Sequence, residues 1–153
     1  MNALELKVPP LILVLVLALA MWLTAMQFPS LDITLPWRHG LATTLSSIGI
    51  LFLLAGMYSF QKAKTTLNPM KPDTASLLVV SGIYCVSRNP IYVGFLLALT
   101  GWAILLSHPL PFLFLPIFVV YMNRFQISPE ERALSAKLGN EYNRYKQGVR
   151  RWL

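Results

Sequence analysis

The sequence predicts an all-α polytopic membrane protein with about four transmembrane helices, including a short helical hairpin, and a cytosolic C-terminal helix. Composition is the first observation behind this prediction. Hydrophobic residues make up 56% of the 153 residues and charged residues only 12%, whereas soluble domains carry about 25% charged residues. A soluble globule of this composition would expose large apolar surfaces, which a bilayer solvates. The length allows one domain, so we expect a single membrane domain over 1–153.

The second observation is a series of uncharged apolar runs. The first covers residues 11–28, close to the roughly 20 residues that cross a bilayer. The alternative is a cleaved signal peptide, because Ala18-Leu19-Ala20 resembles a cleavage site. The preceding segment has a single base, Lys7, beside the acid Glu5, which is weak for a signal peptide. A retained span is therefore favoured, and we expect two N-terminal spans within residues 1–60.

The second run, residues 41–60, is also uncharged and contains small residues that let membrane helices pack closely. These residues are Ser46, Ser47, Gly49, Gly56 and Ser59. The third and fourth runs, 91–106 and 110–122, are short and separated by three residues. They predict a tight helical hairpin over 91–122, with Pro111 and Pro116 shortening or kinking its second helix.

Charge placement predicts the orientation. All but one of the 13 Lys and Arg residues lie before the first run, between the second and third runs, or in the tail; the exception is Arg38. Under the positive-inside rule, four spans then place both termini in the cytosol, as for a bacterial inner-membrane protein. The net charge of +7 fits a membrane surface better than nucleic acid, because no nucleic-acid-binding motif occurs. The single cysteine and two separated histidines predict no metal site.

Two cytosolic segments are left for chemistry: the loop 61–90 and the helical tail 123–153. Ser128, Pro129 and Glu131 have the spacing of a helix start with a capping box. Glu130 is not needed for capping and is therefore available for another role. Gly139 is expected to break this helix. Tyr142 and Tyr145 then share one face of a basic segment, whose alternative interpretation is an amphipathic helix at the lipid headgroups.

These two segments carry a family resemblance. Residues 82–94, G-I-Y-C-V-S-R-N-P-I-Y-V-G, resemble the G-x-Y-x-x-x-R-[HN]-P-x-Y-x-G signature of the isoprenylcysteine carboxyl methyltransferase and phospholipid methyltransferase superfamily. Residues 130–145 resemble its second motif, E-E-x-x-L-x-x-x-F-G-x-E-Y-x-x-Y, with Leu138 in place of the aromatic residue. The resemblance covers residues 65–152, and the sequence is similar to the pattern of bacterial-type members. Two linked motifs at matching separation make it specific.

The resemblance implies an all-helical membrane methyltransferase that uses S-adenosyl-L-methionine and releases S-adenosyl-L-homocysteine. The chain has no glycine-rich nucleotide fingerprint, which suits such a fold. A carboxylate can accept hydrogen bonds from ribose hydroxyls or an ammonium group, which suits Glu130. Carried over position by position, the implied cofactor-binding residues are Ser76, Leu77, Leu78, Val79, Tyr84, Asn89, Pro90, Ile91, Tyr92 and Glu130.

The substrate positions depart from the family pattern. Gln126 stands where eukaryotic carboxyl methyltransferases have a substrate-binding arginine, and Arg124 lies two residues earlier; both are candidate substrate-binding residues. The expected partners are membrane lipids and a lipophilic or lipidated substrate with a carboxylate, amine or phenol acceptor. No catalytic residue or oligomeric state is assigned. The alternatives are a non-catalytic membrane scaffold, or a reductase on the related fold of the sterol reductases.

Overall fold

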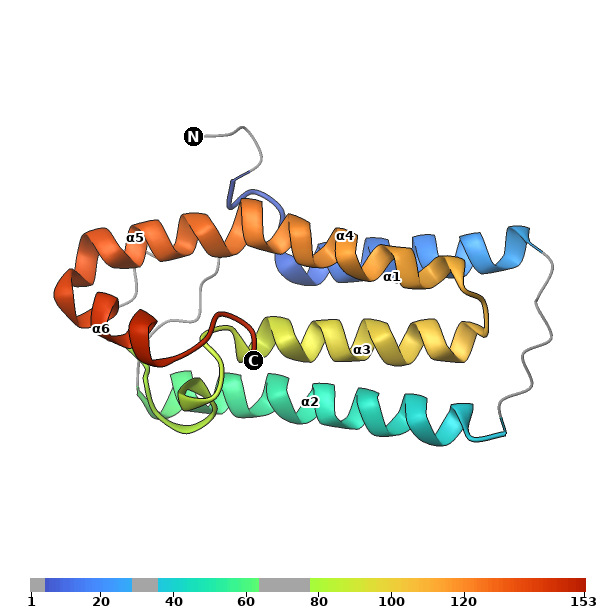
Figure 1. The fold of residues 1–153 in the computed structure, drawn as a ribbon, viewed down its shortest axis with the longest axis horizontal. Coiled ribbons are helices and arrows are strands. Elements are labelled where there is room, and N and C mark those ends of the chain that lie inside the picture. Colours follow the sequence, from blue (N-terminus) through green and yellow to red (C-terminus); the bar gives the residue numbers. More distant parts are fainter. Residues whose placement is uncertain (1–4, 29–35, 64–77) are drawn as a thin grey trace.

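The computed structural model describes residues 5–28, 36–63 and 78–153, and all regular secondary structure in these ranges is helical. The long helices lie side by side along one axis, with the C-terminal helices extending beyond the others at one end (Figure 1). In chain order the elements are α1 (Pro10–Gln27), α2 (Arg38–Lys62), η2 (Gly82–Cys85), α3 (Pro90–Leu106), η3 (Leu110–Leu113), α4 (Phe114–Tyr121), η4 (Met122–Ile127), α5 (Ser128–Leu138) and α6 (Asn140–Gly148).

Three helical stretches are long and apolar enough to cross a membrane: α1, α2 and the continuous stretch Leu110–Leu138. The fourth apolar helix, α3, has 17 residues, or roughly 26 Å at about 1.5 Å per residue, which is near the short limit for a span. Large side chains such as Leu15, Leu51 and Val120 are more than half exposed, as expected for faces that lipid covers. These features confirm the all-helical membrane architecture, while the count of four spans stays a prediction.

Helix α3 packs most closely against α2, through the small residues that the sequence analysis singled out on α2. A Cβ atom added at Gly49 would lie 2.7 Å from the carbonyl oxygen of Gly94, and one added at Gly94 would lie 2.6 Å from that of Gly49. Farther along, a Cβ at Gly101 would lie 2.8 Å from the Ala42 carbonyl oxygen. The backbones touch at glycine on both sides, which is how membrane helices approach closely. The small residues on α3 were not recognised from the sequence.

The other face of α3 packs on α1 and α4. The buried side chains of this core include Met21, Leu99, Phe118 and Met122. The indole nitrogen of Trp102 on α3 donates a hydrogen bond to the carbonyl of Ala18 on α1, at 3.1 Å. Helices α3 and α4 are antiparallel and joined by a short turn (Figure 1), as the hairpin prediction states. The closest partner of α3 is nevertheless α2, because glycines of both helices lie at that interface.

Helix α5 is assigned from Ser128, but the predicted N-cap role of Ser128 is wrong. Ser128 has helical dihedral angles and makes no capping hydrogen bond, so the helix runs on from α4 through η4, a π-helical turn. Pro129 lacks an N–H group, which frees the carbonyl of Phe125 four residues earlier; the backbone N–H of Leu6 donates to that carbonyl at 3.0 Å. The wider π turn is rare and is found mostly inside α-helices, and here the helix continues through it past the proline.

The prolines of the fourth run do not interrupt it. Pro111 lies in the 3-10 turn η3, and Pro116 is the third residue of α4. Both are near the start of the continuous helix, where a missing N–H costs little. The predicted shortening is therefore confined to the first turns.

The two ends of the described chain meet α5 at neighbouring positions. Glu5 pairs with Arg132 at 2.8 Å, and Arg151 pairs with Glu131. Both ends therefore lie at the same end of the helical bundle (Figure 1), as an even number of membrane crossings requires. Which side of the membrane this end faces stays a prediction.

Candidate functional site

The two sequence motifs meet at a hydrogen-bonded cluster formed by Tyr92, Gln126 and Glu130, called here the Tyr92–Glu130 cluster. The hydroxyl of Tyr92, in the first turn of α3, donates to Oε1 of Glu130 on α5 at 2.7 Å. The side-chain amide of Gln126 donates to the same carboxylate oxygen. Tyr92 is 7% exposed and Gln126 is 2% exposed, so both donors are shielded from water. The structure thus joins positions 38 residues apart in the chain.

The continuous helix explains the place of Gln126. Residues four apart lie on one face of a helix, so the unbroken turn from η4 into α5 brings Gln126 beside Glu130. The two predicted substrate residues, however, lie apart. Arg124 is exposed and its guanidinium lies over the ring of Phe125, 5.8 Å from the centroid, because residues two apart do not share a helical face.

The start of α3 fixes the position of Tyr92. Pro90 occupies the first helical position, and the backbone N–H groups of Tyr92 and Val93 both donate to the carbonyl of Asn89 at 3.0 Å. The hydroxyl oxygen of Ser87 accepts the Asn89 N–H at 3.0 Å. The Asn89 side-chain amide donates to the carbonyl of Arg151 at 2.8 Å. Asn89, a predicted cofactor residue, therefore holds the C-terminal residues with its side chain.

The other predicted cofactor residues divide between the site and the helix interface. Pro90 is buried, and Ile91 faces α2, where its side chain lies 2.7 Å from a Cβ added at Gly56. Val79 is buried and Leu78 is half-buried. Ser76 and Leu77 lie outside the described residues.

Tyr84 lies on η2, which precedes α3 in the chain, and its side chain is buried. Its ring packs edge-on against Phe60 of α2, with centroids 5.4 Å apart. Its carbonyl accepts a hydrogen bond from the hydroxyl of Tyr145 at 2.7 Å. Burial raises the pKa of Tyr84 well above its ordinary value, and the nearby Tyr145 and Glu130 raise it further. The phenol therefore stays neutral at physiological pH.

Helix α6 folds back against this loop. Gly139 has a positive φ of 55°, a conformation that glycine adopts without steric cost, and the chain turns there as predicted. Tyr142 is 3% exposed and lies 6.2 Å from Tyr145 between ring centroids. Burial is the main cause that raises the pKa of Tyr142 to about 12. The shared tyrosine face thus packs on the protein, which disfavours the alternative of an aromatic face inserted among lipid headgroups.

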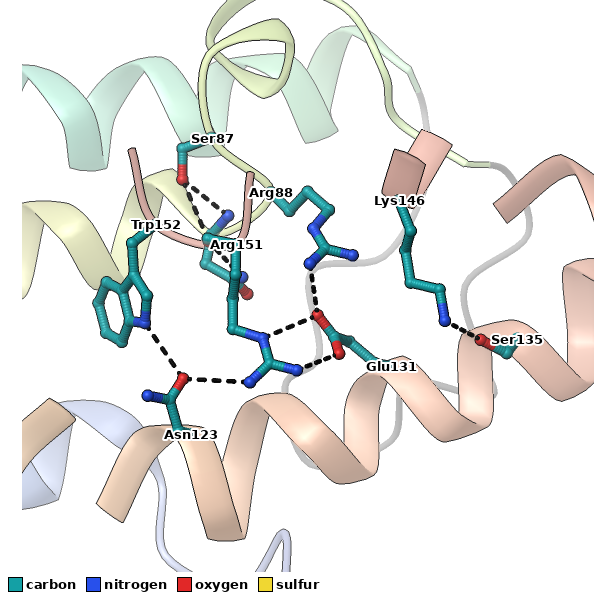
Figure 2. A network of polar contacts seen from close by, with 9 residues as sticks. Ser87, Arg88, Asn123, Glu131, Ser135, Lys146, Arg151 and Trp152 are labelled. Atoms are coloured by element: carbon teal, nitrogen blue, oxygen red, sulfur yellow. Dashed lines mark hydrogen bonds and ion pairs between the residues drawn. The ribbon is translucent and has the colours of Figure 1, made fainter. Parts of the chain in front are cut away.

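A second polar network, which was not predicted from the sequence, surrounds Glu131 (Figure 2). The Arg151 guanidinium contacts both carboxylate oxygens, with Nε 3.1 Å from Oε1 and Nη2 2.5 Å from Oε2. Nη2 of Arg88 lies 3.2 Å from Oε1. Asn123 accepts hydrogen bonds from Arg151 at 3.5 Å and from the Trp152 indole at 3.1 Å. Glu131 therefore neutralises two arginines and does not act as the predicted capping-box carboxylate.

The sequence offered a partial signal for this network. Arg88 belongs to the first motif and Glu131 to the second, so an opposite-charge pair between them was readable. Arg151 is one base among several in the tail, and nothing in its spacing distinguishes it from Arg150, which is exposed.

Comparison with known proteins places the chain in a family. The phospholipid methyltransferase family matches residues 37–141, which contain the Tyr92–Glu130 cluster. An uncharacterized protein of Haemophilus influenzae is 48% identical over 63 residues, which is 41% of this chain and the whole of that protein. No solved structure matches the chain.

Two named relatives are isoprenylcysteine methyltransferases. Protein-S-isoprenylcysteine O-methyltransferase of Saccharomyces cerevisiae is 32% identical over 133 residues, covering 80% of this chain and 53% of the yeast protein. Protein-S-isoprenylcysteine O-methyltransferase B of Arabidopsis thaliana is 24% identical over 138 residues, covering 86% of this chain and 70% of the plant protein. This chain thus spans about half the length of the yeast relative. By the match over 37–141, the chain belongs to the phospholipid methyltransferase family.

Proposed function

We propose that this protein is an S-adenosyl-L-methionine-dependent methyltransferase that acts at the membrane on a lipophilic substrate. The observation that carries the proposal is the Tyr92–Glu130 hydrogen bond, which joins the two motifs in a chain of a methyltransferase family. The proposed setting is the bacterial inner membrane, with the cluster and both termini facing the cytosol. Membrane lipids are the proposed surroundings of the substrate.

The chemistry of the cluster fits the methyl donor. Glu130 offers a carboxylate that two buried donors orient, and a carboxylate accepts strong hydrogen bonds from hydroxyl or ammonium groups. The rings of Tyr84 and Tyr92 offer aromatic surface of the kind that suits an adenine. Glu130, Tyr84 and Tyr92 are therefore the residues that would hold the donor, and Leu78 and Val79 would add apolar walls.

Positioning is the contribution that this chain's residues make. When bound, the donor supplies an electrophilic methyl group on a sulfonium, and in-line transfer depends on close approach of the acceptor. Tyr92 and Gln126 hold Glu130 in one orientation through a phenol hydroxyl and a side-chain amide. Tyr92 also stands at the first turn of an apolar helix, so a substrate with its apolar part in the bilayer would bring its polar end to this level.

Binding of S-adenosyl-L-homocysteine to detergent-purified protein tests the proposal. Isothermal titration calorimetry should detect micromolar binding to the wild type and none to Glu130→Ala, because the variant lacks the acceptor carboxylate. Glu141→Ala is the matched control, since Glu141 is an exposed carboxylate on α6 and its removal should leave binding unchanged. Well-folded wild-type protein that binds no S-adenosyl-L-homocysteine would contradict the proposal.

A second assay identifies the acceptor class. Membranes containing the protein are incubated with radiolabelled S-adenosyl-L-methionine, and the lipids are extracted and separated by chromatography. We expect label in a lipid fraction with wild-type protein and not with Glu130→Ala.

A further inference from the structure

Three segments that are distant in sequence converge on Glu131. Arg88 belongs to the loop 81–89, Glu131 to α5, and Arg151 to residues 149–153, called here the C-terminal strap. Figure 2 shows both guanidinium groups directed at the one carboxylate. The Arg151 guanidinium donates to both carboxylate oxygens of Glu131. Such a bidentate pair is directional as well as electrostatic.

The loop and the strap are also tied to each other next to the candidate site. The backbone N–H of Arg88 donates to the carbonyl of Arg150 at 3.0 Å, and Asn89 donates to the carbonyl of Arg151. Asn89 is the residue whose carbonyl starts the helix that carries Tyr92. The network is therefore fastened to Tyr92 on one side, and to Glu130, the chain neighbour of Glu131, on the other.

The Arg88–Glu131 part of the network is largely buried. The side chains of Arg88 and Glu131 are 12% and 14% exposed. Nε and Nη1 of Arg88 are buried and have no hydrogen-bond partner in the part of the chain that the structure describes. Removing one member of a buried ion pair leaves the other charge uncompensated, which is strongly destabilising. Without the Glu131 charge, Arg88 and Arg151 would repel each other, and the loop and strap would separate from α5.

We propose that Glu131 is a positioning residue: by pairing Arg88 and Arg151, it locks the loop and the C-terminal strap onto α5 and so holds Tyr92 beside Glu130. This inference rests on the proposed function. It gives two adjacent carboxylates different roles. Glu130 faces the cluster that would hold the methyl donor, while Glu131 faces the two arginines and acts through them.

A double-mutant cycle tests this role. S-adenosyl-L-homocysteine is titrated into detergent-purified wild type, Glu131→Gln, Arg151→Ala and the double variant, and thermal unfolding is followed in each. We expect each single variant to bind about tenfold more weakly and the double variant to bind no more weakly than Glu131→Gln, because residues of one network are not additive. Arg132→Ala is the control: it removes an arginine on α5 that does not pair with Glu131, and it should leave the affinity unchanged.

The affinity for S-adenosyl-L-homocysteine distinguishes a positioning role of Glu131 from a role in stability alone. Weaker binding by protein that still unfolds cooperatively above the assay temperature supports the proposal. Multiplicative losses in the double variant, or weaker binding in Glu131→Gln without any loss in Arg151→Ala, would overturn it, the latter in favour of direct contact with the ligand. If Glu131→Gln does not fold, Arg151→Ala decides by itself, since its affinity either falls or is retained. Failure of the wild type to bind would instead refute the proposed function.

Discussion

The interface between α2 and α3 and the junction between the loop 81–89 and the C-terminal strap are held by opposite kinds of contact. The first is apolar and close, with the backbones touching at Gly49 and Gly94. The second is polar and uses one carboxylate, Glu131, to bind two arginines. Small side chains therefore specify the packing of the bundle, whereas charges distant in sequence specify the junction beside the candidate site.

Changing Gly94 to valine should have a large effect on stability, because it breaks the first kind of contact. A Cβ at Gly94 would lie 2.6 Å from the carbonyl oxygen of Gly49 and 2.8 Å from Cγ of Leu53, and backbone atoms yield little. Overpacking of this kind destabilises by about 1–3 kcal/mol. Thermal unfolding in detergent measures the loss.

Gly40→Ala is the matched control for this prediction. Gly40 lies on α2 as Gly49 does, but a Cβ there meets nothing within 4 Å, and alanine favours a helix by up to about 1 kcal/mol. Equal stabilities for Gly94→Val and Gly40→Ala would show that the close approach of α2 and α3 does not exist.

Changing Trp152 to phenylalanine should have a smaller effect and sharpens the polar side of the comparison. The variant loses the indole hydrogen bond to Asn123 but keeps a ring near Phe118, whose centroid lies 6.5 Å away. A single hydrogen bond contributes about 0.5–1.5 kcal/mol net, so the unfolding temperature should fall only slightly. A loss as large as that of Gly94→Val would mean that the strap stabilises the whole bundle rather than the junction alone.

The helices and their packing residues on α2 were predictable from the sequence because both depend on local patterns. Uncharged runs predict apolar helices, and Gly49 and Gly56 predict close approach wherever the partner lies. The sequence wrongly predicted that Ser128 caps a new helix, since local capping preference does not include Leu6, whose N–H donates to the carbonyl that Pro129 frees. That contact joins residues more than a hundred positions apart and leaves no local signal.

The candidate site was predicted in part. The resemblance selected Tyr92 and Glu130, which the structure brings into hydrogen-bond contact. The substrate contact of Gln126 stays a prediction, while its amide contacts Glu130, because the unbroken helix places residues four apart on one face. Arg151 was not singled out, since the partner of a charge in a basic tail depends on how the tail folds.

The most direct test of the account is whether Tyr92 and Glu130 act as a unit in binding the methyl donor. The affinity of S-adenosyl-L-homocysteine is measured by calorimetry for the wild type, Tyr92→Phe, Glu130→Gln and the double variant. An intramolecular hydrogen bond contributes about 0.5–1.5 kcal/mol net, so Tyr92→Phe should weaken binding by up to about tenfold, and Glu130→Gln more. The account predicts that the double variant binds no more weakly than Glu130→Gln. Independent, multiplicative losses, or full affinity in Tyr92→Phe, would contradict it.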